Sequence, residues 1–158
     1  MKKAASLRAA LSAAVPEFRK NPSRLRLWIE DGSGMSRQTP DLSFAFEYRL
    51  NVLVEETATD IALIALALFR WLRVNQPELL SPGARGFAFD ADILDNETAD
   101  ILFQLDLREN VAVAPREEGG FSLDYVAEPD PLFEDELGAG GLPEIPDLAE
   151  VQTDLDQR

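Results

Sequence analysis

Five polar residues gather between positions 90 and 97, and they form the densest set of candidate cation ligands: Asp90, Asp92, Asp95, Asn96 and Glu97. A calcium loop of the EF-hand type needs acids at its positions 1, 3 and 5, a glycine at 6 and a glutamate at 12. Here the glycine is missing, and the alternation of residues places Asp90 and Asp92 on an exposed strand face. A solvated hairpin is therefore the favoured interpretation, and a weak cation site is the alternative.

The composition excludes the common routes to catalysis. The chain has no His and no Cys, so the usual general base, zinc ligand and thiolate nucleophile are missing. The glycine-containing stretch at residues 31–34 lacks the lysine and the following helix of a phosphate-binding loop. We expect no catalytic residue, no metal centre and no cofactor, and therefore no enzyme.

The two tryptophans have arginines close by in the sequence, a combination typical of interface anchors. Trp28 follows Arg26, and Trp71 stands between Arg70 and Arg73. The alternative is that both rings lie at the edges of the core, with arginine side chains reaching past them to solvent. The sequence alone leaves both interpretations open.

The charge of the 158-residue chain is negative and unevenly distributed. Its 29 acidic and 15 basic residues give a net charge of −14. Residues 1–30 carry a net charge of +5, whereas residues 128–158 carry −9. A negative surface disfavours sequence-specific nucleic-acid binding and anionic membranes. The longest apolar run, residues 61–69, is about half of the roughly 20 residues that a membrane helix needs. No targeting segment is apparent, so we expect a soluble protein made in a cytoplasm.

The composition changes at residue 128, where prolines, glycines and acids begin to dominate. We therefore predict a folded domain over residues 1–127 and an extended acidic tail over residues 128–158. Sparse apolar side chains in this tail are predicted to fill pockets on a partner protein. They are Leu132, Phe133, Leu142, Ile145, Leu148, Val151 and Leu155.

The spacing of apolar residues predicts two helices and several strands. The first helix should run from a cap at Ser6 to about residue 18, and the second from residue 59 or 60 to about 75. The expected strands are 24–29, closed by a turn at 31–34, then 42–54, 87–93, 99–108, 111–114 and 121–125. The second strand is longer than a usual strand, so we expect it to bend or to pair beyond the domain edge. The fold class is α+β, an antiparallel sheet with two helices packed on one face.

The second helix is apolar on almost every side, so two neighbours must cover it. One stripe should pack on the sheet. The opposite side could be covered by the first helix or by another subunit, and the sequence favours neither. For the second case the predicted subunit interface is Leu63, Leu66, Ala67, Arg70, Trp71 and Arg73.

Several short stretches recur together, in order, in one known family. They include Asn21-Pro22 with Leu25-Arg26, Leu42-Ser43-Phe44, the heptapeptide WLRVNQP at residues 71–77, and GFAFDADI at residues 86–93. The chain resembles the tail completion protein R family of contractile-tailed phages and contractile tail-like bacteriocins. The resemblance covers roughly residues 1–110 and does not extend to the acidic tail.

This resemblance implies a structural virion protein that completes the tail, with a fold like that of tail terminators. It implies a ring, expected to be six-fold, that caps tube or sheath and joins the head or collar. The implied partners are other copies of the chain, tail tube and sheath proteins, and a connector or collar protein. The implied location is the upper end of the tail, with the host cytoplasm as the place of assembly. The alternative is an acidic adaptor, inhibitor or assembly factor that binds basic protein surfaces.

Overall fold

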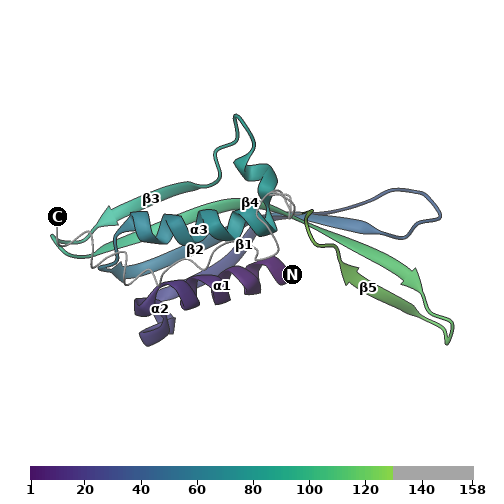
Figure 1. The fold of residues 1–158 in the computed structure, drawn as a ribbon, viewed down its shortest axis with the longest axis horizontal. Helices are drawn as coiled ribbons and strands as arrows, with labels where there is room; N and C mark the ends of the chain where they lie inside the picture. The colour runs from purple at the N-terminus through teal and green to yellow at the C-terminus, as the bar shows by residue number, and fades with distance from the viewer. Residues whose placement is uncertain (130–158) are drawn as a thin grey trace, which may run out of the picture.

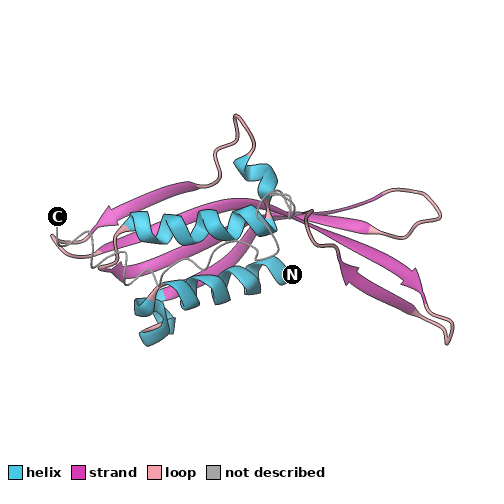
Figure 2. Cartoon of the chain, in the orientation of Figure 1, coloured by secondary structure: helices cyan, strands magenta, loops and turns pink. Residues whose placement is uncertain are grey.

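The fold is one antiparallel sheet with two helices on one of its faces (Figures 1 and 2). The computed structural model describes residues 1–129. The strands are β1 (Leu25–Ser36), β2 (Phe44–Thr57), β3 (Ala88–Ile93), β4 (Ala99–Pro115) and β5 (Phe121–Tyr125). Their order is β1-β2-β4-β3, and β5 pairs with the distal part of β4. The helices are α1 (Lys2–Ala14), α2 (Pro16–Lys20) and α3 (Ile61–Asn75), with 3-10 turns η1 (Pro22–Arg24) and η2 (Pro77–Leu80). The α+β prediction is confirmed.

The core lies between the sheet and helices α1 and α3. Alternate residues of the two central strands point to the helices, and Leu50, Val52, Phe103 and Leu105 are fully buried there. The helices supply the other half of the core with a second set of fully buried side chains: Leu7, Leu11, Phe18, Ile64, Leu68 and Leu72. Burial of one such side chain stabilises the folded state by about 1.5–3 kcal/mol.

The first helix starts earlier than predicted and is interrupted. It begins at Lys2, and Ser6 lies inside it rather than capping it. Val15 is extended, with φ −111° and ψ 109°, because the residue before a proline avoids the helical region. Pro16 then opens α2 as a separate short helix. The predicted start and cap at Ser6 are therefore wrong, and the helix predicted to run to about residue 18 is divided at Val15.

The second helix follows its prediction closely. The Asp60 carboxylate accepts a hydrogen bond from the Ala62 amide at 2.7 Å, which caps α3. The helix ends at Asn75, before Gln76 and Pro77. The predicted hairpin is also present, with Ile93 opposite Ala99 across its turn. Two predicted strands, 99–108 and 111–114, are one continuous strand, β4.

The first strand does not end at the predicted turn. It continues through residues 31–34 to Ser36, with a shift of register between Glu30 and Ser33. Asp31 adopts φ 52° at this bulge, a conformation that aspartate tolerates better than most residues. The glycines at 32 and 34 lie within a paired strand because β2 extends equally far beside them.

Beyond the helices the strands continue as two hairpins, formed by residues 33–47 and 110–125, that we call the arm (Figure 1). The two hairpins share one ladder at their base, where Phe44 lies opposite Val111. The predicted over-long strand is thus explained by pairing beyond the helical cover. A helical layer covers the sheet only between the arm and the β3–β4 turn.

The predicted apolar alternation of β4 continues to residue 109, where a glutamate takes an inward-facing position. The Glu109 side chain is 2 % exposed. It accepts hydrogen bonds from the Lys2 amide at 2.9 Å, from the Lys3 amide at 3.3 Å and from the Tyr48 hydroxyl. Burial and this hydrogen bond raise the pKa of Tyr48 above its ordinary value. A carboxylate at the start of α1 is favoured by the unpaired amides and the helix dipole.

Lys3, next to Glu109, also binds the end of the described chain to the domain. The Lys3 ammonium group donates to Gln76 Oε1 at 2.8 Å, to the Arg108 carbonyl at 2.7 Å and to Glu128 Oε1 at 2.7 Å. Glu128, the first residue of the predicted tail, is therefore held against the domain by its ion pair with Lys3. The predicted tail from residue 130 onward, with its seven partner-binding residues, lies outside the described residues.

A second carboxylate fixes the opposite end of the helical layer. Glu17 of α2 accepts hydrogen bonds from the hydroxyls of Thr57 at 2.8 Å and Thr59 at 2.6 Å. Burial alone would raise its pKa, but these bonds and those from the Ala58 and Thr59 amides hold the pKa of Glu17 below its ordinary value. The carboxylate therefore links α2 to the turn that precedes α3.

We predict that Tyr48→Phe lowers the free energy of unfolding by about 1.5–3 kcal/mol, because a buried carboxylate loses one hydrogen-bond donor. Urea denaturation at neutral pH measures the change. Tyr125→Phe is the matched control, since the Tyr125 hydroxyl bonds only at an exposed position, and it should change stability by less than about 0.5 kcal/mol. Equal effects of the two substitutions would contradict the assigned role of Glu109.

Candidate assembly surfaces

The flank of α3 that carries Leu63, Ala67 and Trp71 is buried within the subunit, where α1 lies beside α3 on the same sheet face (Figure 1). Leu63, Ala67 and Trp71 are each 5 % exposed. The Trp71 indole donates to the Ser6 hydroxyl at 3.0 Å, which explains why Ser6 lies inside α1 with its side chain turned to α3. The sequence left open whether the first helix or another subunit covers α3. Within the subunit, the first helix covers this flank.

This packing divides the predicted subunit interface into two groups. Leu63, Ala67 and Trp71 are already buried inside the subunit, so they offer almost no surface to another copy. Leu66 and Arg70 are partly exposed, and Arg73 is exposed. A contact between subunits through α3 stays a prediction for the second group.

The two tryptophans do not come together. Trp28 pairs with Asn51 across β1 and β2, on the sheet face that the helices do not cover. Its indole donates to Glu30 at 2.9 Å, and the residue is 36 % exposed. Trp71 lies on the other side of the sheet, so the arginines near each tryptophan belong to separate surfaces.

The helix-free face of the sheet carries more acids than bases. Its three arginines each form an ion pair on the same face: Arg26 with Glu55 at 3.7 Å, Arg49 with Asp106 at 3.1 Å and Arg108 with Glu47 at 3.3 Å. Asp31 also pairs with Arg49, at 3.4 Å, and further acids on this face are Glu30, Asp90, Asp92 and Asp100. Its arginines are thus neutralised locally, and the face presents excess negative charge.

At the centre of this face two amide side chains meet. The Gln104 side chain donates to Asn51 Oδ1 at 3.0 Å. Asn51 is only 1 % exposed, and its Nδ2 has no hydrogen-bond partner among the described residues. Asn51 is therefore buried on a sheet face over which none of the described helices lies.

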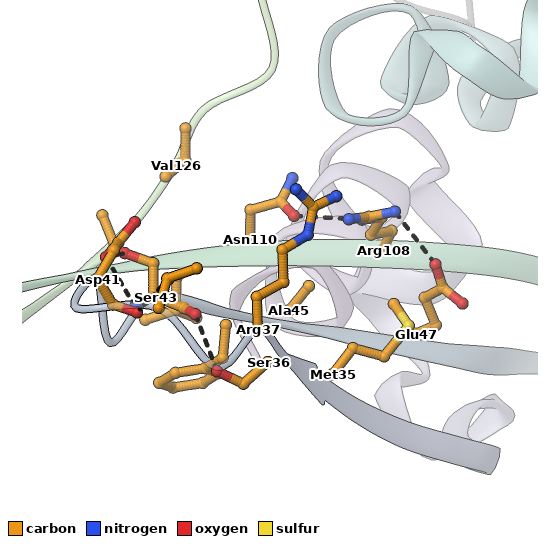
Figure 3. A pocket seen from close by; sticks show the side chains of 14 residues that line it. Met35, Ser36, Arg37, Asp41, Ser43, Ala45, Glu47, Arg108, Asn110 and Val126 are labelled. Carbon is orange, nitrogen blue, oxygen red and sulfur yellow. Dashed lines mark hydrogen bonds and ion pairs between the residues drawn. The ribbon is translucent and has the colours of Figure 1, made fainter.

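A hollow opens where the arm leaves the helix-free face (Figure 3). Its volume is about 520 Å³. On one side the Asp41 carboxylate accepts from the Ser43 hydroxyl at 2.6 Å, and on the other Arg108 bridges Asn110 at 3.2 Å and Glu47 at 3.3 Å. These polar groups bond to one another, and they do not converge on a common point as catalytic groups would.

The candidate cation ligands at residues 90–97 remain dispersed. Asp90 and Asp92 are exposed on β3, and Asp95 accepts hydrogen bonds from the Glu97 and Thr98 amides at 2.7 Å. These bonds hold the pKa of Asp95 below its ordinary value and shape the turn. Within residues 1–129 no three acids lie close enough to hold a metal ion. In the same part of the chain, no helix has the length and apolar character needed to cross a bilayer.

The comparison with known families gives a match over residues 1–129, to the family described as P2 phage tail completion protein R (GpR). The chain belongs to this family. It is also 36 % identical over 134 residues to tail completion protein R of Escherichia phage P2, across 83 % of this chain and 86 % of that protein. No solved structure matches the chain significantly.

Membership of the tail completion protein R family makes the chain a structural phage tail protein and not an enzyme. The resemblance noted in the sequence is confirmed, and the match covers the whole described domain. The residues that sequence reasoning missed are Lys3, Tyr48 and Glu109. One signal was available for Glu109, because it continues the inward series Ile101, Phe103, Leu105 and Leu107.

We predict that Ala67→Leu lowers the free energy of unfolding by about 1–3 kcal/mol, because the site between α3 and α1 has no room for three more carbons. Ala62→Leu, at an exposed position of the same helix, is the matched control and should be nearly neutral. Urea denaturation of both variants at equal concentration measures the difference. A neutral Ala67→Leu would show that α1 does not cover this side of α3.

Proposed function

We propose that the chain forms a ring, expected to be six-fold, that caps the upper end of a contractile tail. Family membership supports the tail-completion role. The observation that carries the ring is the distribution of exposed apolar side chains at two opposite ends of the subunit. Among the exposed large apolar side chains, Phe89, Ile93 and Leu94 lie near the β3–β4 turn, and Phe121 and Leu123 lie on the arm, with Val126 directly after it.

Such surfaces on a virion protein are interaction sites, because soluble monomers rarely leave large apolar patches uncovered. Different patches at opposite ends favour a head-to-tail contact, and a head-to-tail contact closes into a ring when its rotation allows. A closed ring ends a polymer by matching the last layer of tube or sheath on one side. Its other side then serves as the joining surface for a head connector or collar protein.

DNA passage places a further requirement on such a ring. Clustered free lysines or arginines on the channel wall would bind phosphates and retard the DNA. The helix-free face meets the requirement, since its arginines are paired and its charge is negative. We propose this face as the channel wall.

The proposal predicts that the purified full chain assembles into a ring or binds the ends of tail tubes or sheaths. Native mass spectrometry measures the number of copies, and co-sedimentation with purified tubes and sheaths measures attachment. Electron microscopy of the pellets should show the protein at one end only. A stable monomer that binds neither structure would overturn the proposal.

The acidic tail is proposed to bind a neighbouring tail protein through its sparse apolar residues. A chain that stops after Pro129 should keep the stability of the domain, because the Lys3–Glu128 ion pair remains, but it should bind tails more weakly. The co-sedimentation assay measures the loss of binding to tails. Repeating it at low and high salt shows how much of the lost binding is electrostatic. Normal attachment of the truncated chain would show that residues 130–158 only increase solubility.

A further inference from the structure

The turn end of β3 and β4 presents apolar side chains that no other part of residues 1–129 covers, next to the acids of the turn. Phe89 is 54 % exposed, Ile93 77 % and Leu94 47 %. Figure 1 shows that β3 lies at the edge of the sheet, where it ends beyond the reach of α1. Residues 88–100 contain no lysine or arginine, and the turn itself carries Asp95 and Glu97. The other three acids of this stretch, Asp90, Asp92 and Asp100, lie on the helix-free face. Among the described residues, none of these five acids forms an ion pair.

The opposite end of the subunit has a concave surface that we call the arm corner. Its floor is the inward face of β5, where Phe121 is 56 % and Leu123 59 % exposed. Its wall is formed by the first residues of α1 and the last turn of α3, including Lys2, Ser6 and Val74. At the wall lies a cleft of about 320 Å³, which Lys2, Val74, Tyr125 and Val126 help to line. Phe121 and Leu123 lie farther along β5, outside this cleft.

Both surfaces belong to the same side of the sheet. Phe89 lies opposite Phe103, and Leu123 lies opposite Val113. Residues 103 and 113 are both odd-numbered members of β4, whose pairing with β2 has no register shift between residues 101 and 111. The two surfaces lie at opposite ends of the elongated domain (Figure 1), so they cannot cover each other within one subunit. A second copy can bring them together.

The accessible charges of the two surfaces are opposite in sign. In the arm corner the Lys2 ammonium group lies 5.0 Å from the Tyr125 ring centroid, and Arg73 is exposed in the last turn of α3. Neither makes an ion pair within residues 1–129. The two carboxylates that line the cleft already have partners inside the subunit, since Glu128 is paired with Lys3 and Glu109 accepts hydrogen bonds from the Lys2 and Lys3 amides.

We propose that the β3–β4 turn of one copy occupies the arm corner of the next copy. Ile93 and Leu94 meet the floor formed by Phe121 and Leu123, while the acids of the turn approach Lys2 and Arg73. This contact rests on the proposed ring, and it names the two surfaces that build it. Because the surfaces differ, the contact is heterologous and repeats around one axis.

The absence of cysteine makes the contact testable by disulfide formation, since each introduced thiol is unique. Ile93→Cys and Leu123→Cys change exposed positions, so both variants should fold. The experiment uses the full chain under mild oxidation. An equimolar mixture of the two single variants should form disulfide-linked dimers, and neither variant alone should do so. The double variant should form a ladder that ends at the ring size.

Asp124→Cys is the matched control, because residue 124 lies next to Leu123 on β5 but faces the other side of the strand. Mixed with Ile93→Cys, it should form no dimers. Reversing a charge in the turn with Glu97→Lys, in the background of the double variant, should reduce the ladder at low salt and leave it unchanged at high salt.

The outcomes separate this contact from the ring itself. A ring by native mass spectrometry without a disulfide between positions 93 and 123 overturns the contact and leaves the proposed function intact. Dimers of Leu123→Cys alone would show arm-to-arm pairing and would also overturn it. A monomer by native mass spectrometry overturns the proposed function, and the contact with it.

Discussion

The buried carboxylate of Glu109 is the constraint on which the arrangement of this domain depends. It lies where the sheet loses its helical cover and becomes the arm. A carboxyl group at that depth is costly unless hydrogen-bond donors surround it. The Lys2 and Lys3 amides and the Tyr48 hydroxyl supply those donors, so α1 must begin at this point of β4. Because α1 is fixed there, it lies along α3 and covers Ala67 and Trp71.

Helices and strands with a regular spacing of apolar residues were predictable from sequence. Segments whose structure depends on residues far away in the chain were not. The boundaries of α3 follow from Asp60 and Pro77, whose effects are local. The continuation of β1 through residues 31–34 depends on β2 extending beside it, and a glycine-rich stretch alone indicates a turn. The start of α1 at Lys2 depends on Glu109, which is 107 residues away from Lys2 in the sequence.

The candidate site divides in the same way. The sequence showed that α3 needs two covers, but the choice between α1 and another subunit depended on tertiary packing. The apolar residues of β3 and β5 were correctly placed on strands, yet their exposure could not be foreseen. It results from where the helical layer ends, since α1 meets the arm only at its base, where Lys2 lies over the Tyr125 ring, and no helix reaches the β3–β4 turn. The surfaces available for assembly are therefore defined by where the helical layer ends.

The unbroken length of β4 has a mechanical consequence. This one strand of 17 residues extends from the β3–β4 turn to the tip of the arm and pairs with β2 over most of its length. The hydrogen bonds of an antiparallel pair are perpendicular to the strands. A pull between the two ends of the subunit would therefore shear many of these bonds at once instead of opening them one by one. A strand pair loaded in shear resists extension. A ring linked through these two ends would therefore resist widening under the force of sheath contraction.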